Sequence, residues 1–230
     1  MADEPLAFSP DQFSGLARVF PLPNLVMFPH VMQALHVFEP RYRALIEEAI
    51  EDDRLVALGV LASGWENDYE GRPALRPTAC LCRIATHQRT EQGTYNVLVL
   101  GVRRLRLVRE LPPKKLFRVV ESEIIDDLEP VGEAQEAAVG LQRELLAAFK
   151  RAMPRVPNAH EQLDQLLGSQ ITLGMLADIV SYTIDLPLDV KLRLLEETDV
   201  LRRTRLLLDA IASRPQPGPA RTFPPDFSVN

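Results

Sequence analysis

Four histidines and two cysteines are the side chains of this sequence that suit a metal ion. Cys80 and Cys82 are separated by one residue in an expected strand, so both thiols point to one face. Zinc sites usually add a second Cys or His pair at short spacing. The histidines are scattered: His30, His36, His87 and His160. We therefore predict free thiols that fill a strand face, with no metal and no other cofactor.

Acidic and nucleophilic side chains give no clear catalytic pattern. Glu47, Glu48 and Glu51–Asp53 form a carboxylate run at the end of an expected helix, where a solvated surface explains them better than paired acid catalysis. No GxxxxGK[ST] phosphate loop occurs. The four lysines have no recognisable nucleophile context. The sequence thus predicts a protein that is not an enzyme.

A charged face is expected late in the strand-rich half of the chain. Arg103, Arg104 and Arg106 lie close together there, and a basic strand is one means of binding RNA. The net charge of −6 is opposite to that of a typical nucleic-acid-binding domain. Glu121 and Glu123 in the next expected strand offer cross-strand partners. We favour a solvated, ion-paired face and keep RNA binding as the alternative.

The best candidates for contacting another protein lie near a sheet edge that prolines interrupt. Proline lacks an amide donor and is confined to edges and strand starts, and Pro21, Pro23 and Pro29 follow one another closely. An incompletely paired edge can accept an extended polypeptide as an added strand. The candidate peptide-binding residues are Phe28, Pro29, Met32 and Trp65. Core packing is the competing role for the same side chains.

The strand signals of the first half predict a barrel. Leu55–Leu61 is almost entirely apolar and is expected to be a central strand. Glu39-Pro40 is expected to start a helix that carries one apolar face. Gly93 is expected to supply the unusual φ of a hairpin turn. About six strands with one early helix predict a small, partly closed β barrel.

Helical periodicity replaces strand alternation in the second half. We predict a long amphipathic helix over Gly132–Met153, with Thr198 or Asp199 capping the final helix. The further helices are expected at Glu161–Leu167, Leu173–Thr183, Asp189–Glu197 and Val200–Ala212. The predicted fold class is therefore α+β. Its expected parts are a flexible lead-in (1–14), the barrel (15–128), a helical bundle (129–213) and a Pro-rich tail (214–230).

Several short motifs, in order, resemble the N-terminal domain of Lon-type ATP-dependent proteases. Phe28-Pro29 and Phe38–Tyr42 carry the signal in the first half, and Leu176–Asp178, Leu194–Glu196 and Thr198–Val200 carry it in the second. His30 stands where the family commonly has a glycine, and a histidine disfavours a turn with φ > 0 at this point. Ala79 likewise replaces a glycine before a strand.

The resemblance implies a PUA-like barrel followed by a helical bundle, as a free-standing domain without the ATPase and peptidase modules. It implies non-catalytic recognition of unfolded polypeptide or a partner protein in quality control. The alternatives are RNA binding, since PUA folds bind RNA in other proteins, and small-molecule binding between barrel and bundle. We expect a cytoplasmic location, because no secretory signal or apolar run of membrane-spanning length occurs.

Overall fold

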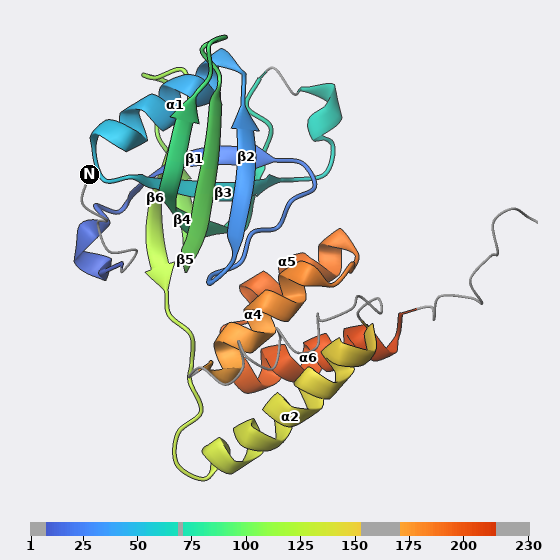
Figure 1. Ribbon diagram of the computed structural model, residues 1–230. Coiled ribbons are helices and arrows are strands. Elements are labelled where there is room, and N and C mark those ends of the chain that lie inside the picture. Colours follow the sequence, from blue (N-terminus) through green and yellow to red (C-terminus); the bar gives the residue numbers. More distant parts are fainter. Residues whose placement is uncertain (1–7, 69–70, 153–170, 215–230) are drawn as a thin grey trace, which may run out of the picture.

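The computed structural model describes residues 8–68, 71–152 and 171–214. Strands and one helix come first, and the remaining helices follow (Figure 1). In chain order the first elements are β1 (Leu16–Leu22), β2 (Met32–Val37), α1 (Pro40–Glu51), β3 (Leu55–Leu61), β4 (Leu75–Arg89), β5 (Tyr95–Glu110) and β6 (Arg118–Ile125). The helices after them are α2 (Ala134–Ala152), α4 (Leu173–Thr183), α5 (Leu188–Glu196) and α6 (Val200–Ala212).

Five strands close into a barrel, and β2 lies outside the closure. β1 pairs in parallel with β3 and antiparallel with β6, while β4 joins β3 to β5 and β5 pairs with β6. β2 pairs only with β5. Pro21 lies opposite Gly59 on β3, beyond the last β6 pair at Val19 and Arg118, so its missing amide donor interrupts no pairing with β6. The predicted α+β barrel and helical part are confirmed, and the barrel is closed.

Glycine permits the two sharpest features of the long β4–β5 hairpin. Gly93 has φ +74° in the turn, as expected. At Gly101 the pairing between the strands shifts, and an added Cβ would lie 2.1 Å from the carbonyl oxygen of Phe28. Only glycine allows this approach of two backbones. The segment before β2 is thereby held against the middle of β5.

The apolar residues form two clusters on opposite faces of β3, which is buried throughout. The larger cluster includes Val56 and Leu58 and joins the inward face of α1 to the bundle helices. The smaller one includes Leu55 and Ala57, and Phe8 and Phe13 pack against it from outside. Residues 8–14 were expected to be flexible, but they contact the barrel. A short 3-10 helix at Pro10–Gln12 lies between Phe8 and Phe13.

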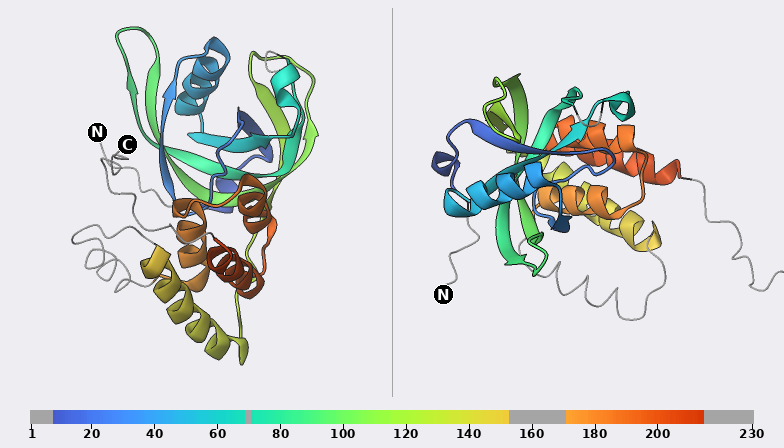
Figure 2. Two further views of the ribbon diagram at one scale, coloured as in Figure 1. Left: turned by 90° about the vertical axis from the view of Figure 1, so that its right-hand side faces the viewer. Right: turned by 90° about the horizontal axis from the view of Figure 1, so that it is seen from above.

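Helix boundaries follow local capping signals. Pro40 opens α1 with Glu39 before it, as predicted. Asp199 caps α6 by accepting a hydrogen bond from the amide of Arg202 at 2.9 Å. The bundle lies against one end of the barrel, with α4 and α5 nearer to it than α2 (Figures 1 and 2). The predicted helix at Glu161–Leu167 and the tail beyond Arg214 lie outside the described residues.

Candidate functional site

The edge strand β2 is the element best placed to receive another chain. It pairs with β5 along one side, and among the described residues no backbone group of Met32–Val37 hydrogen-bonds to a segment on the other side. One side chain covers part of this edge, since Gln33 Nε2 donates to the Ala34 carbonyl at 2.5 Å. Unpaired strand edges are templates for strand addition. We call this side of β2 the free edge.

An exposed apolar surface lies beside the free edge. Met32 pairs with Leu100 and Ala34 pairs with Leu98, and residues directly opposite in a sheet share a face. Met32 is 48% exposed, Ala34 is exposed, and both leucines are partly exposed. We call these four residues the edge face. On the other side of the sheet Val97 and Val99 are buried and Leu35 is partly buried, which makes the edge face an outer face with an apolar character.

Polar residues border the edge face. His36 Nδ1 lies 2.7 Å from Asn96 Oδ1, and the His36 ring stacks on Phe38 with ring centroids 6.2 Å apart. Phe38 is 62% exposed. A shallow hollow runs across β2, β5 and β4 at this point, with Ala34 and Leu98 among its lining residues. An apolar centre with a polar border is typical of surfaces that contact proteins.

The four candidate peptide-binding residues do not gather on one surface. Met32 lies on the edge face, but Phe28 is fully buried and Pro29 is buried as well. Phe28 packs in the larger cluster, so its expected place on an exposed edge is corrected. Trp65 opens a short 3-10 helix (Trp65–Asn67) after β3 and is partly exposed.

Sequence reasoning missed Ala34, Leu98 and Leu100. Their strands were expected, but the pairing of Met32 with Leu100 depends on the Pro29-His30 turn. His30 has φ +64°, so this turn has φ > 0 although a histidine occupies it. Its amide donates to the Gly101 carbonyl at 2.8 Å, which starts the pairing of this segment with β5.

Arg104 is buried in the structure, not solvated. Its side chain is 2% exposed and pairs with Asp178 of α4 and with Asp127, with Nη1–Oδ1 3.1 Å to Asp127. Arg203 of α6 joins the same group through both aspartates. Arg104 Nε also donates to the Leu195 carbonyl at 3.0 Å. Nucleic acid therefore cannot reach Arg104, which ties the barrel to the bundle.

The remaining arginines of β5 pair with acidic residues across the surface. Arg106 Nη1 lies 3.4 Å from Glu123 Oε2, and Arg109 Nη2 lies 2.6 Å from Glu121 Oε1. Both carboxylates are the cross-strand partners that the sequence suggested. Arg103 Nε lies 3.8 Å from Asp126 Oδ1, and the Arg103 side chain also packs over the Phe8 ring, 5.6 Å from its centroid. The arginine-rich strand is thus neutralised along its length.

The carboxylate run at the end of α1 has a partner that the sequence did not reveal. Arg18 of β1 is nearly buried and contacts Glu48, Asp52 and Asp53, with Nη1–Oδ1 2.7 Å to Asp53. Burial opposes the charge of Arg18, but the hydrogen bonds and charges of these carboxylates raise its pKa. Part of the run therefore fixes α1 to β1.

Within the described ranges, no group of three His, Cys, Asp or Glu residues has the geometry of a metal site. Cys80 and Cys82 are both buried and free. Burial and the neighbouring Cys82 raise the pKa of the Cys80 thiol. No helix in the described part of the chain combines the length and the apolar character that crossing a membrane requires.

Comparison with known proteins places these features in a family. A family model described as the ATP-dependent protease La (LON) substrate-binding domain matches residues 17–213. The match runs from β1 to α6. The chain belongs to the Lon substrate-binding domain family.

The curated relatives in this family are much longer than this chain. The Lon protease of Anaeromyxobacter dehalogenans is 25% identical over 212 residues, which are 90% of this chain and 24% of that protein. The Lon protease of Xanthomonas oryzae pv. oryzae is 28% identical over 212 residues, which are 91% and 24%. The chain therefore spans about a quarter of the length of these relatives, and the match is to their substrate-binding domain.

Solved Lon N-terminal domains share the fold. The N-terminal domain of Mycobacterium avium complex Lon protease superposes with a TM-score of 0.66 at 20% identity, over 86% of this chain and 99% of that chain. The Lon N-terminal domain protein from Xanthomonas campestris superposes with a TM-score of 0.61 at 20% identity, over 84% and 97%. The barrel with its appended helices is thus the fold of Lon N-terminal domains.

Proposed function

We propose that this Lon substrate-binding domain recognises polypeptide without catalysing a reaction, and that an extended segment of an unfolded or partner protein adds along the free edge of β2. The observation that carries this proposal is the edge face of Met32, Ala34, Leu98 and Leu100 beside an unpaired strand edge. Backbone hydrogen bonds would supply affinity for any extended chain. The family match to a substrate-binding domain supports polypeptide recognition, and we propose that this recognition serves protein quality control.

The edge face suits partners of varied sequence. Met32 is flexible and polarisable, which lets it pack against different apolar side chains. The bound segment must be ordered on binding, and this cost keeps the affinity for any one segment weak, roughly micromolar. The Gln33–Ala34 contact would have to open for an added strand to use the Ala34 carbonyl.

The test is titration of a permanently unfolded protein, reduced and carboxymethylated α-lactalbumin, into wild type and surface variants. Met32→Ser removes apolar contact area, and Ala34→Lys places a charge on the edge face. We expect each to weaken binding about tenfold, since burying a methionine side chain contributes roughly 1.5–3 kcal/mol. Val139→Ser is the matched control, because Val139 is 49% exposed on α2 and away from β2.

Equal affinity of wild type, Met32→Ser and Ala34→Lys would remove the edge face from the proposal. Absence of binding by folded wild type would remove the recognition role itself. Circular dichroism spectra must match across the set, so that a loss of affinity reports the surface and not the fold.

A further inference from the structure

The backbone groups of β2 are divided between its two sides. In an antiparallel pair of strands, opposite residues alternate between hydrogen-bonded and non-hydrogen-bonded pairs. Just before β2, the amide of Gly101 donates to the Val31 carbonyl at 2.9 Å, and Met32 lies opposite Leu100 one position further on. Met32 and Leu100 therefore form a non-hydrogen-bonded pair, in which the amide and carbonyl of Met32 point away from β5.

The same alternation continues to the end of the strand. Every second residue of β2, starting with Gln33, bonds to β5, and the residues between them turn their amides and carbonyls to the free edge: Met32, Ala34 and His36. The contact of Gln33 Nε2 with the Ala34 carbonyl, at 2.5 Å, agrees with this direction, because a carbonyl bonded within the sheet is shielded by β5. The residues with backbone groups on the free edge are thus the ones whose side chains lie on the outer face.

An added strand would extend the edge face. Antiparallel addition is favoured, because parallel pairing is slightly less stable per residue. Residues directly opposite one another in a sheet place their side chains on the same face. In antiparallel addition, the residue that exchanges both backbone hydrogen bonds with Ala34 therefore also places its side chain on the edge face. Apolar side chains suit every second position of the added strand.

The intervening residues of the added strand would meet polar groups on the opposite face. Gln33 lies on that face, and its Oε1 accepts a hydrogen bond from the hydroxyl of Tyr182 on α4. Lys191 of α5 lies over the Tyr182 ring, 5.8 Å from its centroid, and donates to the Tyr182 carbonyl at 2.9 Å. These contacts hold a carboxamide and a hydroxyl beside the free edge. Hydroxyl and amide side chains can donate to and accept from both groups.

We propose that the recognised segments are strand-forming ones in which apolar and polar residues alternate, and that they add antiparallel to β2. The apolar residues bond through their own amides and carbonyls to Met32, Ala34 and His36, and their side chains cover the edge face. The polar residues face Gln33 and Tyr182. This inference rests on the proposed function and names the class of segment that it selects. Segments with helical spacing place only part of their apolar residues on the edge face.

The test compares two N-acetylated, C-amidated peptides of one composition, with three valines and four threonines between terminal lysines. The alternating peptide places its three valines on one face of a strand. The grouped peptide has its valines next to one another, so that one of them falls on the opposite face. Both carry the same charge. We expect wild type to bind the alternating peptide about tenfold more tightly, since one more valine reaches the edge face.

Single N-methyl groups in the alternating peptide show which of its amides bond to β2. A methyl group on the central valine amide should weaken binding about tenfold, because this amide donates to β2 in antiparallel addition. A methyl group on the next threonine amide should leave the affinity unchanged, because that amide points away from β2. Parallel addition exchanges the two roles. Loss of affinity through the threonine amide alone would therefore overturn the proposal.

Two substitutions at one position of β2 test the protein side. Ala34→Pro removes one amide donor from the free edge and keeps the pairing with β5, because proline is tolerated where the amide faces solvent. Ala34→Val keeps both the amide and an apolar side chain. We expect the proline variant to bind the alternating peptide about tenfold more weakly and the valine variant to bind it like wild type.

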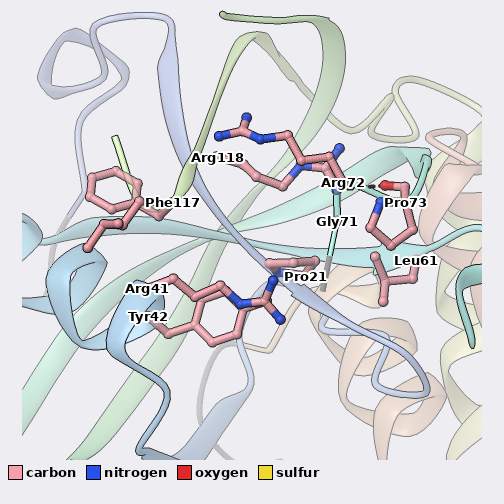
Figure 3. A pocket seen from close by; sticks show the side chains of 10 residues that line it. Pro21, Arg41, Tyr42, Leu61, Gly71, Arg72, Pro73, Phe117 and Arg118 are labelled. Carbon is pink, nitrogen blue, oxygen red and sulfur yellow. Dashed lines mark hydrogen bonds between the residues drawn. The ribbon is translucent and has the colours of Figure 1, made fainter. Parts of the chain in front are cut away.

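A control substitution lies on another part of the barrel. Leu116→Ser changes a side chain that is 71% exposed and lines the pocket drawn in Figure 3. None of the described lining residues of that pocket belongs to β2 or β5. Leu116→Ser should therefore leave the affinity for both peptides unchanged.

Hydrogen exchange gives a measurement on wild type that needs no variant to fold. The amides of Met32, Ala34 and His36 should exchange rapidly in the free protein, whereas those of Gln33 and Leu35 should be protected by their bonds to β5. The alternating peptide should protect the first set. Unchanged exchange of these three amides in the presence of saturating peptide would contradict the proposal.

The outcomes separate this proposal from the proposed function. Equal binding of the two peptides, equal effects of the two methyl groups, or no binding of the alternating peptide would overturn the alternating, antiparallel pattern. If carboxymethylated α-lactalbumin still binds wild type and Met32→Ser weakens that binding, the proposed function stands without it. If neither the peptides nor α-lactalbumin bind, the proposed function itself fails and this inference falls with it.

Discussion

Arg104 of β5 and Asp178 of α4 form a bidentate ion pair between the barrel and the bundle, with Nη1–Oδ2 3.2 Å and Nη2–Oδ1 2.5 Å. Both side chains are buried, at 2% and 0% exposure. Removing one partner of such a pair destabilises the fold strongly, because the other charge remains buried without a compensating charge. The pair and its neighbours Asp127 and Arg203 therefore hold two structural layers in one arrangement.

Arg104→Met should lower the free energy of unfolding by roughly 3–5 kcal/mol, since it leaves Asp178 buried with fewer partners. Arg106→Met, two residues along the same strand, should have no measurable effect because its ion pair with Glu123 is exposed. Urea denaturation followed by far-UV circular dichroism measures both. Similar losses for the two variants would contradict the assignment of Arg104 to the interface.

Phe28→Ser should destabilise the protein by roughly 3–5 kcal/mol, because it removes a fully buried ring and leaves a cavity and a hydroxyl in the core. Met32→Ser, four residues later on the exposed edge face, should change stability little. Thermal unfolding of both variants gives the comparison. A stable Phe28→Ser protein would show that this segment does not pack as described.

Gly101→Ala should cost roughly 2 kcal/mol or more, since its Cβ would overlap the Phe28 carbonyl oxygen, a backbone atom that cannot move alone. The control is Gly140→Ala on the exposed side of α2, where nothing lies within 4 Å of the new Cβ. That change should stabilise α2 by about 0.5–1 kcal/mol. Opposite signs of the two effects in urea denaturation are the expected result.

His30→Gly should raise the free energy of unfolding, because His30 has φ +64° and glycine reaches this region without a Cβ penalty. His30→Val should lower it, because a β-branched side chain is strained there. The gain for glycine should be at most about 1 kcal/mol, since glycine also adds entropy to the unfolded chain. The order Gly, His, Val in thermal stability tests the turn.

Acidification should lower the free energy of unfolding by weakening the ion pairs of Glu110 with Arg72 and Arg118. Partial burial favours the neutral carboxyl, but hydrogen bonds and charges of Arg118 and Arg72 outweigh it and lower the Glu110 pKa. Because the pKa of Glu110 is lower in the folded state than in the unfolded state, the ionised carboxylate stabilises the fold. This stabilisation is fully present above the unfolded-state pKa, near 4.5. It is lost as the pH falls through the folded-state pKa.

The unfolding free energy of wild type should therefore fall more steeply below about pH 4.5 than that of Glu110→Gln. Glu91→Gln in the exposed hairpin turn is the control for losing one carboxylate. Urea titrations at several pH values between pH 3 and 7 give the slopes. Parallel curves for wild type and Glu110→Gln would refute the contribution of this ion pair.

Local signals were enough to predict many elements. The all-apolar run Leu55–Leu61 and the helical spacing of Leu173–Thr183 and Val200–Ala212 predicted β3, α4 and α6 with the bounds that the structure has. A strand buried on both faces leaves a continuous apolar run in the chain, and a helix with one apolar face leaves a periodic pattern. The capping residue Asp199 likewise acts within its own helix.

The candidate site depended on pairing that no local signal reveals. Alternation in β5 showed that Arg104 and Leu105 point to opposite faces, but not that the bundle covers the arginine. The edge face arises from strands β2 and β5, which the hairpin and Gly101 bring into register. Burial of Phe28 follows from the same arrangement. Such tertiary relationships lie beyond propensity and periodicity.

The closure of the barrel has a consequence for the order of folding. Residues 16–19 of β1 pair with residues 118–121 of β6, so the first strand cannot complete its pairing until the last one exists. Contacts between segments so distant in sequence slow folding, because a long loop must close before they form. During synthesis, β1, whose residues are mostly buried in the finished fold, stays without its β6 neighbour while β2, β3, β4 and β5 emerge. A truncation before Arg118 leaves β1 open to association with other chains.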